Sequence, residues 1–293
     1  MSMAGSRQSG MVFAMLKTRL IREQDSSLHF EVMAWLIQNF GSPPRPPVPS
    51  PLHKSPSFEA LSWGDMDTRT VFDWADDHFH AIKTECHLEN LDILLTPAGD
   101  GLDTAQLAAS RRLDALASGR NPYLVDTQTK DNPQVFYDPR DCVEPGYFAA
   151  RIILQLADIR ISDYRSEYPL SPMMQRMVTL IAATYCRQGF TLANVPHEIS
   201  RFLTPPSDLR AVPLRIVVNS LCYATCLGLR VRRQSAEQII ATYGTRMPKI
   251  FRRKVRQACR QIDSHAEDLA VLQMLAEPRA KRRETPHPLN IRA

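Results

Sequence analysis

Apolar side chains recur every three or four residues over much of this sequence, which is the spacing of an amphipathic helix. The first such stretch lies within residues 11–40, where Leu28, Val32 and Leu36 share one face, and Gly41 ends it. The same spacing predicts a series of further helices, which are residues 68–82 (capped by Thr68 or Thr70), 103–117, 146–163, 171–188, 208–230, 235–243 and 247–276.

Two short segments are predicted to be β-strands instead. Residues 91–96 lead into a turn at residues 97–100, and residues 134–137 end at Asp138 and Pro139. Strands and helices together predict an α+β fold that is predominantly helical, with a small sheet packed on the helical core.

The positions of proline and of basic residues indicate how the chain is divided into a domain and its flanking segments. Residues 43–56 hold seven prolines, which fix φ and donate no hydrogen bond, so this segment is predicted to be an extended strap or spacer. A ligand for an aromatic-lined groove is the alternative. Residues 1–27 are predicted to be a frayed N-terminal segment, residues 28–277 a single domain, and residues 278–293 a basic disordered tail.

Composition narrows the class of protein. The chain of 293 residues has 36 lysines and arginines against 31 acidic residues, a formal charge of +5, and 44% hydrophobic residues. That apolar fraction is too high for a disordered chain, and the charge is weaker than that of a dedicated nucleic-acid binder. Six cysteines without close spacing exclude a disulfide-stapled miniprotein and favour a reducing compartment.

The charge pattern predicts a cytoplasmic protein without a membrane partner. The longest stretch without a charge, residues 216–229, has fourteen residues, whereas a bilayer span needs about 20. A short apolar run at residues 10–16 is followed by no small-residue cleavage site typical of a secretory signal. We therefore expect residues 216–229 to be a buried helix.

Metal-ligating residue types are densest between positions 76 and 87. They are Asp76, Asp77, His78, His80, Glu85, Cys86 and His87. On a helix His78 and His80 point about 200° apart, so they cannot both bind one ion. Asp76 and His80 share a face, but that spacing is also ordinary on a solvated helix. No metal or cofactor is predicted, and an enzyme site at residues 78–87 is kept as a minor alternative.

The spacing of the cysteines is weaker evidence for a metal site than the cluster at positions 76–87. Cys222 and Cys226 lie four residues apart, but a metal site needs two more ligands, and the neighbouring residues are Leu221, Tyr223, Ala224 and Leu227. We expect both thiols to be core residues. No context typical of a reactive thiolate surrounds the remaining cysteines, which are Cys86, Cys142, Cys186 and Cys259.

A stripe of cations marks the predicted helix at residues 247–262. Its members recur at three- and four-residue spacing and are Lys249, Arg252, Arg253, Arg256 and Arg260. Opposite them fall mostly apolar residues, namely Ile250, Val255, Ala258 and Ile262. Such a helix can lay cations along phosphates or an acidic partner, and a solvated surface helix is the plainer interpretation. Residues 236–243 followed by Gly244 also have the length of a helix-turn-helix.

The residues between positions 137 and 158 follow an order that is found in a known class of enzyme. The segment runs Tyr137-Asp138-Pro139, then Gly146-Tyr147-Phe148, then an apolar helix. Zincin-type metallopeptidases carry His-Glu-x-x-His on a helix so placed, where two histidines bind zinc and the glutamate activates water.

With four other stretches in the same order, this segment resembles an uncharacterised bacterial family with a zincin-like core. The stretches are residues 35–41 followed by prolines, 71–79, 189–194 and 247–261, and the resemblance spans roughly residues 28–262. It implies a zincin-like fold in which the metal and catalytic positions fall on Leu154, Gln155 and Asp158. A further acidic ligand is implied near Leu180.

This chain departs from the family at those positions. Leu154 cannot coordinate zinc, and Gln155 cannot take a proton from metal-bound water as a carboxylate does. Asp158 alone does not hold a transition metal, and it is predicted to pair with Arg151 or Arg160 or to be solvated. The resemblance therefore implies a zincin-like fold that does not bind zinc.

These patterns support two principal hypotheses about function. The first is a catalytically inactive zincin-like protein with a binding or scaffolding role, for which a protein partner is one candidate that the sequence does not identify. The second is a binder of nucleic acid or an acidic partner that uses residues 247–262 and the basic tail.

Overall fold

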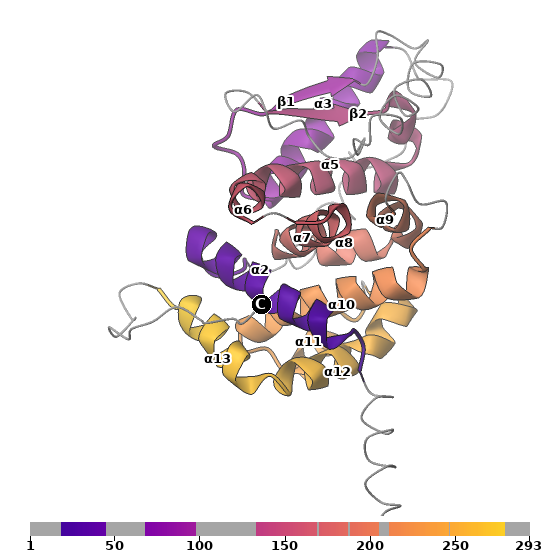
Figure 1. The fold of residues 1–293 in the computed structure, drawn as a ribbon. Coiled ribbons are helices and arrows are strands. Elements are labelled where there is room, and N and C mark those ends of the chain that lie inside the picture. The colour runs from indigo at the N-terminus through magenta and orange to yellow at the C-terminus, as the bar shows by residue number, and fades with distance from the viewer. Residues whose placement is uncertain are drawn as a thin grey trace, which may run out of the picture.

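Helices stacked in layers build most of this protein (Figure 1). The computed structural model describes residues 19–44, 68–97, 133–168, 170–186, 188–204, 211–245 and 247–278. Its elements in chain order are α2 (Glu23–Phe40), α3 (Thr68–Glu85), β1 (Leu94–Pro97), β2 (Gln134–Tyr137), η4 (Pro139–Val143), α5 (Pro145–Arg160), α6 (Ser162–Glu167), α7 (Pro172–Tyr185), α8 (Gly189–Ala193), α9 (Pro196–Leu203), α10 (Leu214–Val231), α11 (Ala236–Tyr243), α12 (Lys249–Asp263) and α13 (Ala266–Leu275).

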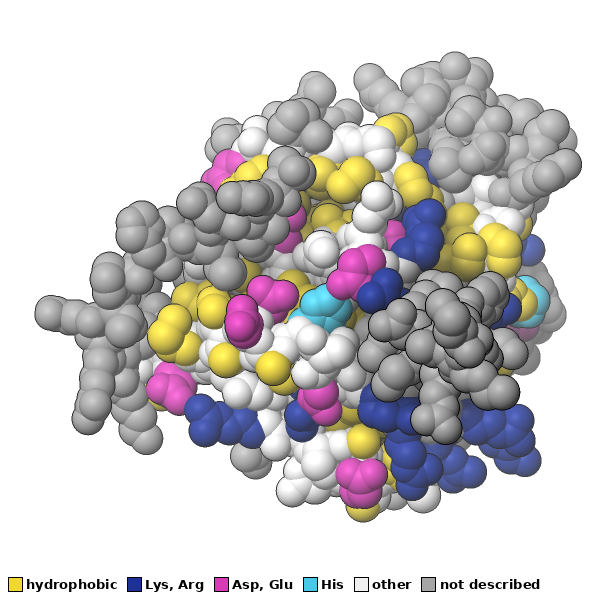
Figure 2. All heavy atoms as spheres, turned by 60° about the horizontal axis from the view of Figure 1, so that its bottom comes forward, with side chains coloured by type: hydrophobic (Ala, Val, Ile, Leu, Met, Phe, Trp, Pro, Cys, Tyr) yellow, Lys and Arg dark blue, Asp and Glu magenta, His cyan; other side chains and the backbone are white. Residues whose placement is uncertain are grey.

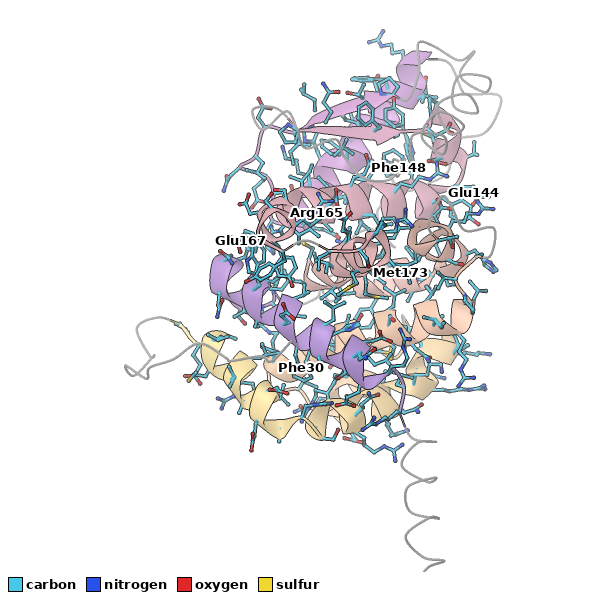
Figure 3. All side chains as sticks on the ribbon, viewed as in Figure 1. Phe30, Glu144, Phe148, Arg165, Glu167 and Met173 are labelled. Atoms are coloured by element: carbon cyan, nitrogen blue, oxygen red, sulfur yellow. The ribbon has the colours of Figure 1, made fainter. Side chains whose placement is uncertain are left out.

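The two strands form a small parallel sheet at one end of the stack. Leu94 lies opposite Gln134 and Pro97 opposite Tyr137. Strand β2 packs on α5, where the ring of Phe148 meets that of Tyr137 at 5.9 Å between centroids (Figure 3). The predicted class, a predominantly helical α+β protein with a small sheet on a helix, is confirmed.

Helices α7 and α10 form the centre of the core. Helix α7 contacts α2, α5 and α10, and α10 also packs along α12. Among the described residues, α10 is the one helix with the length and hydropathy of a membrane span, and 72% of that span is buried inside the protein. Its apolar character is accounted for by this packing, as the uncharged run at residues 216–229 predicts.

Two helix predictions need correction. The helix expected over residues 247–276 is broken at Ser264 and His265 into α12 and α13, although neither glycine nor proline interrupts it. Ser264 Oγ closes the end of α12 by donating to the carbonyl of Gln261 at 2.6 Å. The short helices α8 and α9 were not among the helices expected, and Pro196 begins the second of them.

The N-terminal boundary also changes. Residues 19–27, expected to be frayed, are packed: Leu20 and Ile21 are buried and α2 begins at Glu23. Gln261 of α12 accepts from the Leu20 N–H at 2.7 Å and donates to the Ile21 carbonyl at 2.9 Å. The helix expected at 103–117, the strap beyond Pro44, and the tail beyond Pro278 lie outside the described residues.

Candidate functional site

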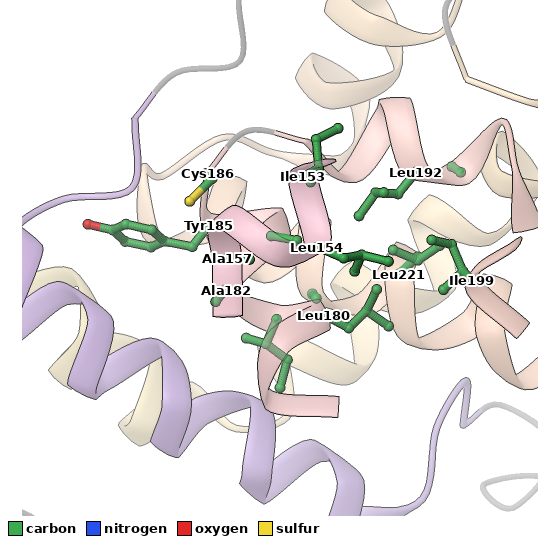
Figure 4. Packing of buried hydrophobic residues seen from close by; sticks show 14 of the residues in the cluster. Ile153, Leu154, Ala157, Leu180, Ala182, Tyr185, Cys186, Leu192, Ile199 and Leu221 are labelled. Atoms are coloured by element: carbon green, nitrogen blue, oxygen red, sulfur yellow. The ribbon is translucent and has the colours of Figure 1, made fainter. Parts of the chain in front are cut away.

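Leu154 lies at the centre of the hydrophobic core. It is completely buried and belongs to one apolar cluster with Leu180, Ile199 and Leu221 (Figure 4). Of the three positions to which the zincin resemblance assigns metal ligands, 154 and 180 are thus filled by leucines in the same cluster, and the third is Asp158. Across the described residues, no three histidine, cysteine or acidic side chains gather closely enough to hold a metal ion.

Gln155 binds the edge of the sheet. Its side-chain oxygen accepts from the Phe136 N–H at 2.8 Å, and its amide nitrogen donates to the Phe136 carbonyl at 2.7 Å. These are the two bonds that a further strand would make with β2, so the glutamine substitutes for a neighbouring peptide group. Gln155 is 3% exposed, and its amide nitrogen also donates to the Arg151 carbonyl at 3.3 Å, so the side chain has a structural role.

Asp158 forms a buried ion pair that the sequence did not identify. Its carboxylate lies 2.9 Å from Nη1 of Arg165 and accepts from the Thr179 hydroxyl at 3.0 Å. The residue is fully buried, so the expectation of a solvated carboxylate is wrong. The expected partners are also wrong, because α6 follows α5 after a single residue and places Arg165 beside the carboxylate (Figure 3).

The two arginines expected to pair with Asp158 have other partners. Arg151 lies between two buried carboxylates, 2.5 Å from Asp141 and 3.0 Å from Glu198. Arg160 donates instead to the carbonyls of Cys86 and His87, at 2.7 and 2.9 Å. Burial raises the pKa of Asp141 to about 6, outweighing the opposing effect of Arg151.

This raised pKa predicts a particular dependence of stability on pH. Asp141 holds its proton to a higher pH in the folded protein than in the unfolded chain. Its contribution to the free energy of unfolding is therefore greatest below pH ~4 and is lost as the pH rises through about 6. The free energy of unfolding of the wild type minus that of Asp141→Asn should therefore fall by about 2 kcal/mol between pH ~4 and ~7. Urea unfolding of both proteins across that range measures it, and a flat or rising difference contradicts the assignment.

The residues at positions 76–87 do not converge. His78 is buried, stacks on Trp74 with 3.7 Å between ring centroids, and donates from Nδ1 to the Trp74 carbonyl at 2.6 Å. Burial lowers the pKa of His78. His80 is exposed on another face and lies 3.4 Å from Asp76. Up to Glu85 the stretch is therefore a helix with one packed and one solvated histidine, and His87 is exposed just beyond its end.

All six cysteines are buried and free, so the core role expected for Cys222 and Cys226 is confirmed. Hydrogen bonding to Cys222 together with burial raises the pKa of Cys226 well above its ordinary value. Cys259, from α12, also contacts Cys226, a proximity that their distance in the sequence conceals. Protonated, buried thiols of this kind are poor nucleophiles.

The cations of α12 lie on the surface. We call Lys249, Arg252, Arg253, Arg256 and Arg260 the basic face, and all five are exposed. Figure 2, which turns this end of the molecule toward the viewer, shows lysine and arginine side chains gathered at the lower right. The opposite side of α12 is buried, with the exception of Ile250, which is 53% exposed at the start of the helix.

A polar network that runs from buried Ser26 to the surface was not predicted from the sequence. The Ser26 hydroxyl lies 2.5 Å from the Tyr223 hydroxyl and 3.3 Å from Nε2 of His265, which in turn lies 3.3 Å from Glu23. Serine, histidine and carboxylate suggest a nucleophilic site, but Ser26 is fully buried and no substrate can reach it. Its partners are 197 and 239 residues away along the chain, so no local pattern could reveal them.

No protein-family model, curated protein or solved structure matches this chain. Its own features therefore define its class. It is a predominantly helical α+β protein in which buried polar groups at Gln155 and Asp158 join neighbouring elements, and the part of its surface that the structure describes includes the basic face of α12.

Proposed function

We propose that this protein is a catalytically inactive, zincin-like binding protein that engages a polyanionic partner through the basic face. The order of motifs along the chain and the small sheet on α5 support the zincin-like assignment. Leucine at position 154, and the structural bonds of Gln155 and Asp158, support the loss of catalysis. Six free cysteines favour the cytoplasm, where thiols stay reduced.

The observation that carries the binding role is a concentration of uncompensated charge. Of the basic face, only Arg256 has an acidic side chain within ion-pair distance among the described residues, namely Glu237 at 3.8 Å. Both of these side chains are largely exposed, so the pair contributes little. Asp263, at the end of the same helix, is held by Arg230. The face therefore presents a positive potential to solution.

Retention on immobilised heparin, a polyanion, tests this role. We expect Arg252→Gln with Arg253→Gln to elute at a clearly lower salt concentration than the wild type, because two cations of the face are removed. The matched control is Arg69→Gln with Arg201→Gln, which removes the same charge from exposed positions on α3 and α9. Equal elution of both variants would show that net charge, and not the basic face, causes retention.

Elemental analysis tests the loss of the metal centre. We expect purified protein, after incubation with zinc and gel filtration, to retain far less than one zinc ion per chain, because Leu154 and Leu180 supply no ligand atoms. A zinc-to-protein ratio near one, lowered by Asp158→Asn, would contradict the inactive assignment.

A further inference from the structure

We propose that the polyanion recognised by the basic face is the phosphate backbone of a nucleic-acid duplex; this inference rests on the proposed function. Lys249 and Arg260 are eleven residues apart, so the face is about 16 Å long at a rise of ~1.5 Å per residue. Each strand of a duplex presents one phosphate charge per ~3.4 Å of the axis, so about five phosphates of one strand fall within that length, one for each cation of the face. The length and charge density of the two surfaces are compatible.

The chemistry of the face favours phosphate. Four of its five cations are arginines, whose planar guanidinium groups donate paired hydrogen bonds to phosphate oxygens. Lys254, half-buried beside them, adds a further cation. Ile250 is the one large apolar side chain exposed on α12, so the face lacks the apolar centre that a protein partner buries.

A membrane does not fit this helix. An amphipathic helix binds a bilayer by inserting its apolar side below the headgroups. In α12 that side is already buried, with Phe251, Val255 and Ile262 each at most 1% exposed and packed within the core next to α10. Apart from Ile250, no large apolar side chain of α12 is exposed to a membrane, whereas the five cations of the basic face are exposed.

A single strand fits less well than a duplex. Proteins that bind single strands stack the bases on exposed aromatic rings. The aromatic residues of α11 and α12, Tyr243 and Phe251, are both buried, and the exposed aromatic rings of the described residues, Phe40, Phe72 and Tyr168, lie outside these helices. Contact through phosphates alone suits a duplex, whose bases are already stacked.

Helix α11, which precedes the basic face, has defined ends. Ser235 caps α11 in a reciprocal capping box with Gln238. Gly244 follows directly, and a Cβ there would lie 2.4 Å from the Ile240 carbonyl oxygen, so no other residue fits without a shift of the backbone. Two successive helices with a glycine between them, the second of which presents cations to solvent, have the order of elements of a helix-turn-helix motif. In this chain five residues, 244–248, separate the two helices.

Fluorescence anisotropy with four labelled probes tests the proposal. The probes are a DNA duplex of about 20 base pairs, an RNA duplex and a DNA single strand of the same sequence, and poly-glutamate. If all five cations meet phosphates, the plot of log Kobs against log salt for a duplex should have a slope of about −4.5. The variant Arg252→Gln with Arg253→Gln should reduce that slope by about 2, and Arg69→Gln with Arg201→Gln should leave it unchanged.

The comparison among probes separates this inference from the proposed function. Tighter binding of either duplex than of the single strand and poly-glutamate supports it, and the two duplexes identify DNA or RNA as the source of the phosphates. Equal or tighter binding of the single strand or poly-glutamate overturns the duplex inference while polyanion binding stands. Binding of none of these probes and no retention on heparin overturns both.

Discussion

Asp158→Ala should destabilise the protein by about 3–5 kcal/mol, because it leaves the guanidinium of Arg165 in the interior without its carboxylate. Asp158 is fully buried, and the side chain of Arg165 is only 14% exposed, so water cannot replace the lost partner. The Thr179 hydroxyl also loses the acceptor it reaches at 3.0 Å. Urea unfolding followed by circular dichroism gives the change in the free energy of unfolding.

Two control variants test whether the unpaired buried charge of Arg165 causes the loss of stability. Glu167→Ala, which removes an exposed carboxylate from α6, should change the free energy of unfolding by no more than about 0.5 kcal/mol. The double variant Asp158→Leu with Arg165→Met should be less destabilised than Asp158→Ala alone, because no unpaired charge is left buried. A loss below ~1 kcal/mol for Asp158→Ala contradicts a structural role for this ion pair.

Gln155→Leu should cost about 2–4 kcal/mol, because the N–H and carbonyl of Phe136 both lose their partners at the edge of β2. A fitting comparison is Gln273→Leu, which removes a single bond, to the Arg230 carbonyl, and should cost about 1 kcal/mol. Urea unfolding measures both, and amide hydrogen exchange at Phe136 should accelerate only in the first variant. A cost for Gln155→Leu no larger than that for Gln273→Leu contradicts the two-bond account.

Gln155→Glu restores the residue type of the zincin motif and tests the same contact in another way. A carboxylate still accepts from the Phe136 N–H but opposes the Phe136 carbonyl, so burial and this repulsion should raise the pKa of the new side chain. Its protonated form is then the one that fits, and the variant should lose stability relative to the wild type as the pH rises through that pKa. A difference independent of pH contradicts this expectation.

Local periodicity predicted the helices well where it was sustained. The helix at α5 and the buried helix α10 follow directly from the spacing of their apolar residues, as does the separation of His78 from His80. Periodicity failed at the end of α12, because the break there is set by tertiary contacts. His265 turns toward Ser26 and Glu23, on the first described helix, and the helix cannot continue straight through it.

The sequence by itself determined two things about this protein: position 154 supplies no zinc ligand, and five cations recur on one side of α12. Both are properties of residue type and local spacing, which need no knowledge of distant neighbours. Only the tertiary structure decided that Gln155 binds the sheet edge, that Asp158 pairs with Arg165, and that the apolar side of α12 is buried while its cations face solvent. Each depends on where another element packs, and helix periodicity carries no information about which elements meet in the fold.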